Sequence, residues 1–260
     1  MISNKKFSLN IHKAGIIIQA RTGSKRFPKK ILCKINNKTI LEILIDRLLV
    51  YFNKEDIYIA TTKKSKDNII LEIIKKKNIN FFRGSENNVL SRFTECAKKN
   101  NLNKIIRLTS DCPLIDPKLM IKLFKIQLKK NFDYSGNCFP YNKRTYPVGS
   151  DLEFFSLNFL KKISADKLSN YEKEHITPFL LKKKFKTHLF KNRNNNSKLR
   201  YTLDHKEDLV VIKKIISYFK KNKIFGNTNQ IIKFLKANRK IMELNSKHVT
   251  NYYFKKLNQL

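Results

Sequence analysis

The side chains best suited to chemistry lie in one short loop that directly follows an apolar run. The run contains Ile16, Ile17 and Ile18, and residues 21–30 then supply a glycine, a serine hydroxyl and five cationic side chains. A β-branched run of this kind predicts a buried strand, and loops after such strands face the ligand crevice of an open α/β sheet. Because cationic side chains match phosphate oxygens, the loop predicts a polyphosphate site. The alternative is a solvated basic turn in a lysine-rich chain.

Two aspartates stand where they could complete such a site. Asp111 follows a strand predicted over residues 104–109, and Asp204 follows one predicted over residues 199–203. A carboxylate at a strand end, facing a cationic loop, suits a Mg²⁺–nucleotide complex, because the metal bridges carboxylate and phosphate oxygens. Asp204 also precedes a predicted helix, where it could serve instead as the N-cap. With Gly23 as its one glycine, the loop matches neither common glycine-rich phosphate motif.

The elements that must position these side chains alternate regularly in the first half of the chain. Hydrophobic periodicity predicts helices over residues 39–52, 67–77, 89–99 and 117–130, and further strands over residues 57–61 and 79–83. Four strand–helix alternations predict an α/β fold with a doubly wound, mostly parallel sheet and helices on both faces. The polar loops at residues 21–30, 83–85 and 111 would then share one crevice.

The second half is less regular. Residues 133–146 contain Gly136, Pro140 and four aromatic residues, which predict a loop-rich or hairpin insertion. Further predicted elements are a strand at 151–155, a helix at 172–184, a strand at 187–190 and an amphipathic helix at 207–220. We expect a single domain over residues 1–260, with an N-terminal extension at 1–13, an insertion at 133–150 and a C-terminal helical extension at 229–260.

The basic excess is large but spread along the chain. A net charge of +36 would suggest a nucleic-acid partner if it were clustered, yet lysines recur in nearly every segment and no nucleic-acid-binding motif is present. We therefore expect non-specific attraction to polyanions at low salt and no specific nucleic acid.

Cysteine spacing and hydropathy speak against a cysteine metal site, a membrane protein and a secreted protein. Cys33, Cys96, Cys112 and Cys138 lie far apart without metal-ligand spacing, so they are predicted to be reduced and structural, with Cys112 a buried thiol beside the site. No apolar stretch approaches the roughly 20 residues that span a bilayer, and the first dozen residues lack a signal-peptide core. We expect a cytoplasmic protein with no membrane partner.

Six ordered blocks of sequence resemble the cytidylyltransferases of the spore-coat polysaccharide type, which are related to the enzymes that make CMP-Kdo and CMP-sialic acid. The blocks extend over about residues 14–245 and read IIIQARTGSKRFPKKIL, FFRGSENNVLSRF, IIRLTSDCPLID, TYPVGSDLEFFS, EKEHITPF and YTLDHKEDL. The resemblance implies a Rossmann-like nucleotidyltransferase fold with a mixed sheet. This chain departs from the family pattern at Lys29 and Ser110, where glycine is common, and at Ser150, where leucine is common. The two missing glycines would restrict positive φ angles in two phosphate-facing loops.

The resemblance also implies roles for individual residues. The CTP phosphates and base would contact Gln19, Ala20, Arg21, Gly23, Ser24, Arg26, Lys30 and Asp111, and the nucleoside pocket would include Arg83, Gly84 and Ser85. Asp111 and Asp204 would hold Mg²⁺. The sugar would face Arg107, Gly149, Asp151, Glu153, Glu174 and His175. His175 could act as a base, as a hydrogen-bond partner of the sugar or as a structural histidine, and Lys143 and Arg144 could contact an anionic sugar or lie in solvent.

The implied reaction is nucleotidyl transfer. The anomeric hydroxyl of a 2-keto-3-deoxy sugar acid, of the ulosonic or nonulosonic type, would attack the α-phosphorus of CTP and expel pyrophosphate, with Arg21, Lys30, Asp111 and Asp204 as the catalytic set. One alternative is transfer to a sugar phosphate or another phosphorylated acceptor such as phosphocholine. A second is a non-catalytic basic nucleic-acid-binding protein. Because relatives are commonly dimers, we expect a homodimer, with residues 133–146 as the candidate interface.

Overall fold

Strand β1 (Ala14–Gln19) runs through the middle of the sheet in the computed structural model, which describes residues 6–248. Seven strands of this part of the chain form one sheet in the order β5-β4-β1-β6-β8-β7-β9. The other strands are β4 (Ile57–Thr62), β5 (Asn80–Gly84), β6 (Lys104–Thr109), β7 (Tyr134–Gly136), β8 (Glu153–Ser156) and β9 (Thr187–Leu189). Within this sheet, β8 alone runs antiparallel to its neighbours, so the predicted mixed, mostly parallel sheet is confirmed.

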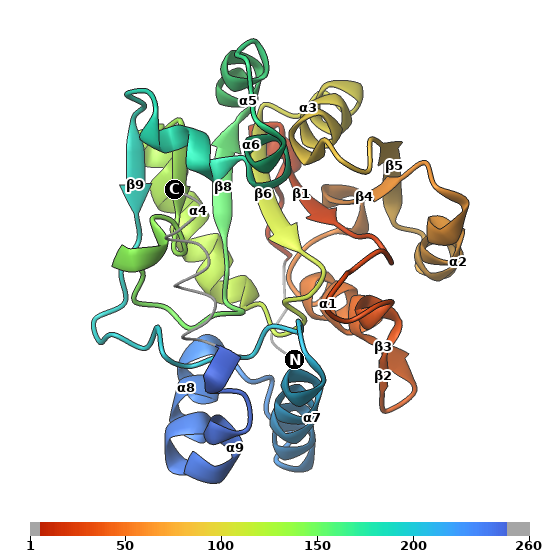
Figure 1. Ribbon diagram of the computed structural model, residues 1–260, viewed down its shortest axis with the longest axis vertical. Helices are drawn as coiled ribbons and strands as arrows, with labels where there is room; N and C mark the ends of the chain where they lie inside the picture. Colours follow the sequence, from red (N-terminus) through yellow and green to blue (C-terminus); the bar gives the residue numbers. More distant parts are fainter. Residues whose placement is uncertain (1–5, 249–260) are drawn as a thin grey trace.

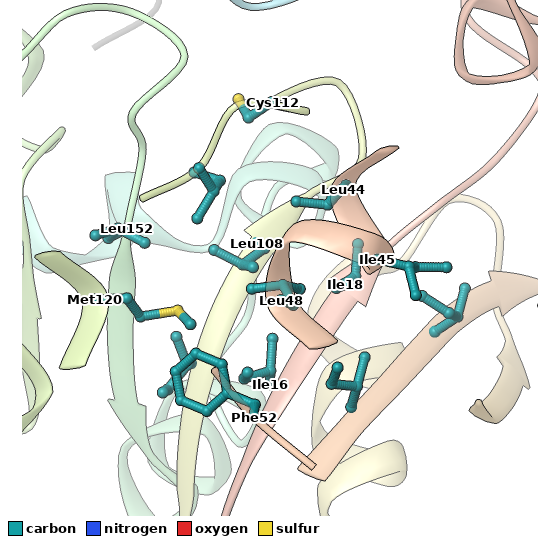
Figure 2. Packing of buried hydrophobic residues seen from close by; sticks show 14 of the residues in the cluster. Ile16, Ile18, Leu44, Ile45, Leu48, Phe52, Leu108, Cys112, Met120 and Leu152 are labelled. Carbon is teal, nitrogen blue, oxygen red and sulfur yellow. The ribbon is translucent and has the colours of Figure 1, made fainter. Parts of the chain in front are cut away.

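Helices cover both faces of this sheet (Figure 1). Ile16 and Ile18 of β1 share one apolar cluster with Leu48 of α1 (Figure 2), whereas Ile17 shares the opposite cluster with Phe93 of α3. The first cluster includes side chains of α1 (Ile40–Leu49), α2 (Asn68–Lys76) and α4 (Pro117–Lys130); the second includes side chains of α3 (Val89–Lys99) and α5 (Leu157–Ser164). The β-branched run is therefore buried on both sides, as its sequence predicts.

A third apolar cluster joins the C-terminal helices to the main body. These helices are α7 (Lys206–Lys221), α8 (Thr228–Ala237) and α9 (Arg239–Glu243), which gather at one end of the molecule (Figure 1). They pack with Ile35 of a small hairpin, β2 (Lys34–Ile35) and β3 (Lys38–Thr39). α8 and α9 lie within the segment 229–260 that is expected to be a C-terminal helical extension, apart from the first residue of α8, and residues 249–260 lie outside the described residues.

Side-chain caps explain where several helices begin. Thr39 and Glu42 form a reciprocal capping box at α1. Asp116 caps α4, which has Pro117 in its first turn, and its other carboxylate oxygen accepts a hydrogen bond from the Thr228 amide at the start of α8. The loop that follows β6 is thereby tied to the C-terminal helices.

Two predicted elements are wrong. Residues 199–203 do not form a strand of the sheet; Arg200 makes one isolated bridge to Val148. The helix predicted over residues 172–184 is broken, because α6 (Asn170–His175) ends at Ile176, whose φ is 63°, and a 3₁₀ turn (Thr177–Leu181) follows. Pro178 lies in that turn and cannot continue the hydrogen bonding of a regular helix.

The segment at residues 133–150 is packed into the chain instead of projecting from it. β7 lies between β8 and β9, and Tyr134, Phe139, Tyr141 and Tyr146 are all buried. The aromatic side chains of the predicted dimer interface therefore contact their own chain. Among residues 6–248, no helix combines the length and apolar character that a membrane span requires.

Candidate functional site

The candidate site begins where β1 and β6 end side by side. Gln19 is opposite Thr109 in the parallel register, and the amide of Ser110 donates to the carbonyl of Gln19. The loop of residues 20–30 and the loop that starts at Ser110 thus leave the sheet at neighbouring points. The two loops therefore lie at the same edge of the sheet, where the sequence predicts a shared crevice.

Asp204 is brought to this point by the irregular segment of residues 199–204. The carbonyl of Asp111 accepts hydrogen bonds from the Leu203 amide, at 2.8 Å, and from the Thr202 hydroxyl, at 3.2 Å. The N-cap alternative for Asp204 is not observed, because α7 begins at Lys206 and the carboxylate of Asp208 accepts from the amides of Asp204 and His205. The side chain of Asp204 is therefore available to the crevice.

Lys30 holds the two aspartates together. Its Nζ lies 2.7 Å from Asp111 Oδ2 and 2.7 Å from Asp204 Oδ1. Burial lowers the pKa of Lys30, but the charges of Asp111 and Asp204 outweigh burial and leave that pKa above its ordinary value. Burial likewise raises the pKa of Asp204, and Lys30, Arg26 and Arg200 overcome it, so the net shift is downward. Both groups stay charged at neutral pH.

A second layer of charge fixes Asp204 from behind. Arg200 is buried and donates to Asp204 Oδ2 at 3.1 Å and to both carboxylate oxygens of Asp208. Asn245 donates to Asp208, and Arg26 reaches Asp204 Oδ1 from the solvent side at 2.8 Å. Arg200 thus holds Asp204 Oδ2, while Asp204 Oδ1 contacts Lys30 and Arg26.

A buried carboxylate anchors the start of the cationic loop at residues 21–30. Asp67 is fully buried and accepts hydrogen bonds from the amide and the hydroxyl of Thr22, at 2.7 Å each. An added Cβ at Gly23 would lie 2.9 Å from Lys66 Nζ, the end of a flexible side chain that could move aside. Lys29 has a φ of 55°, so the loop keeps a left-handed residue where the related family usually has glycine.

Three of the other predicted phosphate-loop residues make contacts elsewhere in the chain. The Ala20 amide donates to the Ala60 carbonyl, and Ser24 Oγ accepts from the Phe27 amide. Arg21 does not reach the aspartates: its guanidinium pairs with Glu174 of α6 at 2.8 Å and donates to the Glu86 carbonyl. The phosphate loop and α6 are therefore joined across the crevice.

A second polar cluster lies on the α3 side of the sheet. Arg107 is buried, pairs with Glu153 at 2.7 Å and donates to Gln19 Oε1 and to the His175 carbonyl. Burial lowers the pKa of Arg107, but Glu153 outweighs burial and raises it overall. His175 lies with its ring 4.5 Å from the ring of Tyr171.

The residues predicted to face a sugar divide into two groups. Glu153, Glu174, Arg107 and His175 belong to the α3 side just described, whereas Asp151 pairs with Arg144 at 2.6 Å and accepts from the Gly149 amide. Arg144 is buried, which contradicts the solvent alternative for this residue, whereas Lys143 is exposed. Gly149 has a φ of 109° and packs directly against the backbone of Thr202.

The nucleoside segment differs from its predicted arrangement at one residue. The guanidinium of Arg83 donates to the carbonyls of Thr62 and Lys64, so it supports the loop after β4. Ser85 Oγ accepts from the Asn88 amide, and Gly84 lies against the side chain of Arg92. Arg92 was not predicted, although the sequence holds a signal: an arginine on the apolar face of a helix, between Val89 and Phe93.

Cys112 is the remaining side chain at this edge of the sheet. Its thiol is buried and lies 3.5 Å from the Thr202 hydroxyl. Burial, followed by the charges of Asp111 and Asp151, holds the pKa of this thiol well above its usual value. A protonated thiol is a poor nucleophile, which agrees with the structural role predicted for Cys112.

The pair of aspartates has the chemistry of a divalent-metal site. Two carboxylate oxygens converge on one ammonium group, so the position between them already accommodates a cation. Mg²⁺ binds proteins through one or two carboxylates and completes its shell with phosphate and water oxygens. Among the residues that the structure describes, no group of three or more histidine, cysteine or carboxylate side chains could hold a metal alone. The donor set therefore fits a metal that arrives with phosphates.

Comparisons with known proteins agree with this geometry. A family model described as cytidylyltransferase matches residues 15–241. The spore coat polysaccharide biosynthesis protein SpsF of Bacillus subtilis is 33% identical over 208 residues, which cover 76% of this chain and 83% of SpsF. The solved structure of a cytidylyltransferase from Leptospira borgpetersenii is 37% identical, has a TM-score of 0.79 and covers 88% of this chain and 96% of its own.

A more distant solved structure shares the fold. It is a CMP:2-keto-3-deoxy-manno-octonic acid synthetase complexed with CTP, 15% identical, with a TM-score of 0.59 over 79% of this chain and 98% of the other. At this identity the likeness concerns the arrangement of strands and helices. The predicted Rossmann-like nucleotidyltransferase type of the sheet is confirmed by the likeness to the Leptospira cytidylyltransferase.

Proposed function

This chain belongs to the cytidylyltransferase family, and from that premise we propose that it transfers CMP from CTP to a sugar acid of the ulosonic or nonulosonic type. The product would serve the synthesis of a surface polysaccharide or glycan, as the name of the Bacillus relative suggests. The observation that carries the proposal is the convergence of Lys30, Asp111 and Asp204 from three distant parts of the sequence on one point at the end of β1 and β6.

The chemical step depends on the positioning of the reactants and the neutralisation of phosphate charge, and it needs no covalent intermediate with the protein. The anomeric hydroxyl oxygen forms a bond to the α-phosphorus, the bond from that phosphorus to the α,β-bridging oxygen breaks, and pyrophosphate leaves with the bonding electrons. The hydroxyl proton passes to solvent. Lys30 and Arg26 lie where they can neutralise phosphate charge, and Arg21 can join them when it leaves Glu174.

Asp111 and Asp204 are the proposed ligands of a divalent metal, with Mg²⁺ as the proposed ion. When bound there, the metal would neutralise the α-phosphate and polarise its P–O bond. Lys30 would then have to shift, because its ammonium occupies the position between the two carboxylates where the metal would bind. Arg200 and Asp208 would keep Asp204 in place during this exchange.

The sugar is proposed to lie against the α3 side of the crevice. Arg107, Glu153 and Glu174 offer charged groups there, and Gln19 connects them to the phosphate loop. The family relation supports CTP as the nucleotide, and the acceptor is the part that needs a direct test. We also propose a homodimer, which sedimentation velocity would reveal.

A panel of substrates tests the proposed function. The protein would be incubated with Mg²⁺, each of the four nucleoside triphosphates and a set of acceptors: 2-keto-3-deoxy sugar acids, sugar 1-phosphates and phosphocholine. Mass spectrometry should detect a CMP-linked sugar acid only with CTP. A CMP-linked product from a phosphorylated acceptor, or no product from any sugar acid, would contradict the proposed acceptor class.

Substitution of either aspartate tests the proposed metal ligands. Asp111→Asn and Asp204→Asn should each lower kcat by about a hundredfold or more, because metal-assisted charge neutralisation contributes several kcal/mol to the barrier. Pyrophosphate release from CTP and the acceptor measures the effect. Asp46→Asn is the matched control, since Asp46 also bridges two lysines, Lys38 and Lys77, but on α1 away from the crevice. Near wild-type rates for both site variants would refute the assignment.

A further inference from the structure

Arg92 is a buried cation whose hydrogen-bonding groups are mostly unused. It lies on the apolar face of α3, is 1% exposed and has no carboxylate within ion-pair distance among residues 6–248. Within these described residues, the Arg92 guanidinium donates one hydrogen bond, from Nη1 to the carbonyl of Ser85. Its buried Nε has no partner there. An arginine carries five N–H donors, so most of them are free.

This arrangement is costly unless a ligand uses it. A buried charge without a partner destabilises a fold, and an unpaired buried donor adds its own desolvation cost. Burial, and then the neighbouring charge of Arg21, lowers the pKa of Arg92 to about 10. The residue therefore remains charged at neutral pH despite its surroundings.

Arg47 shows how the same chain treats a partly buried arginine with a structural role. Arg47 donates to the carbonyls of Ile115, Phe225 and Gly226, and its guanidinium lies 4.1 Å from the centre of the Phe225 ring. Its pKa is also lowered to about 10 by burial, yet three of its donors have protein partners. Arg92 is the more buried of the two, and it has fewer partners within the described part of the chain.

The position of Arg92 identifies the part of the site that it serves. An added Cβ at Gly84 would lie 3.0 Å from Arg92 Cγ, so the turn at Gly84 and Ser85 packs directly on this side chain. Arg21 and Arg107 lie within electrostatic range of it. Arg92 thus contacts the turn at Gly84 and Ser85, which is expected to line the nucleoside pocket.

We infer that Arg92 is a specificity-determining residue that recognises the cytosine ring of CTP. Cytosine presents two adjacent acceptors, O2 and N3, which match neighbouring N–H groups of a planar guanidinium. Uracil carries a hydrogen on N3 and would oppose a donor there. The inference rests on CTP being the nucleotide of the proposed function. The base is favoured over a phosphate because Lys30, Arg26 and the aspartates already lie together at a separate point.

Nucleotide selectivity is the test, because a merely structural role would not change it. Isothermal titration would give the Kd of CTP, UTP and inorganic pyrophosphate for the wild type, Arg92→Met, Arg92→Lys and Arg47→Met, each with Mg²⁺. The Arg92 variants should bind CTP about tenfold or more weaker and keep their affinity for UTP and pyrophosphate, which is the discrimination that a two-pronged arginine–base contact provides. Arg92→Lys keeps the buried charge, so it separates loss of the planar contact from loss of folding.

Arg47→Met serves as the control for a structural effect of losing an arginine. Arg47→Met should lower the melting temperature and leave the ratio of UTP to CTP affinities unchanged. Equal weakening of CTP, UTP and pyrophosphate in the Arg92 variants, or an unchanged ratio, would overturn the inference. A wild-type protein that binds no CTP would instead contradict the proposed function itself.

Discussion

Lys30 determines the charge state of the crevice before any ligand binds. Its ammonium neutralises part of the charge on Asp111 and Asp204, and without it the two carboxylates would repel each other. Arg21 is likewise paired with Glu174, so the residues proposed to bind phosphate are already occupied by acidic partners. Ligand binding at this site is therefore an exchange of ionic partners.

The lowered pKa of Asp204 predicts a specific acid sensitivity. A carboxyl group whose pKa is depressed by folding stabilises the native state above its unfolded pKa of about 3.9, and this contribution is lost as the pH falls through its folded value. The free energy of unfolding should thus decrease below about pH 4, and Asp204→Asn should show a shallower decrease. Urea denaturation between pH 2.5 and 6 measures both slopes. Identical slopes would mean that Asp204 is not stabilised by its cationic neighbours.

Cys112 should be dispensable for the chemistry. Its thiol is buried and its pKa is raised by burial and nearby carboxylates, so it is not a thiolate at neutral pH. We expect Cys112→Ser to keep kcat within about threefold and to lower the free energy of unfolding by about 1 kcal/mol, because the hydroxyl can retain the contacts to Thr109 and Thr202. A hundredfold loss of kcat in a variant with a native circular dichroism spectrum would restore a direct role for the thiol.

At the scale of elements, the irregular segment of residues 199–204 is as important as any strand. It is held by hydrogen bonds between Val148 and the residues Leu199 and Tyr201, and by the contact of Leu203 with Asp111. This segment carries Asp204, so whatever displaces it moves one proposed metal ligand.

Gly149→Ala is predicted to displace that segment. The residue has a φ of 109°, and an added Cβ would lie 2.5 Å from the Thr202 amide nitrogen, which belongs to backbone that cannot move aside cheaply. We expect a loss of about 2 kcal/mol in stability, together with a loss of kcat at temperatures where the variant is folded. Gly226→Ala is the control: it also has positive φ, but its Cβ would meet the Phe219 ring in the C-terminal helices. Equal kcat values for the two variants would show that Gly149 does not position the segment that carries Asp204.

Sequence patterns predict the regular elements well, and the exceptions have physical causes. The strands and helices up to α4 follow local periodicity, and burial on both faces makes that signal strong. Residues 199–203 have the composition of a strand, yet their hydrogen bonds go to Asp111 and Val148, which no local pattern can specify. Similarly, the family resemblance places Arg83 in the nucleoside pocket, whereas the guanidinium of Arg83 donates to the carbonyls of Thr62 and Lys64. The contact of Arg92 with Ser85 becomes visible only in the packed structure.

At the scale of the whole molecule, the net charge of +36 predicts a weak and salt-sensitive attraction to polyanions. We expect fluorescence anisotropy to detect binding of a DNA duplex at 50 mM salt and to lose it by about 300 mM, because released counterions drive such binding. CTP with Mg²⁺ should still raise the melting temperature at the higher salt. Tight DNA binding at 300 mM salt together with no thermal shift by CTP would favour the nucleic-acid-binding alternative.

The route by which Asp204 reaches its partners has a consequence for biosynthesis. Every strand of the described sheet lies before residue 190, whereas Asp204 and its support at Asp208 and Asn245 follow later. A nascent chain that has emerged from the ribosome only as far as β9 could pair its strands, but it would hold Lys30 and Asp111 without the second acid. Such a chain would lack activity until the segment from Asp204 to Asn245 has also emerged and folded.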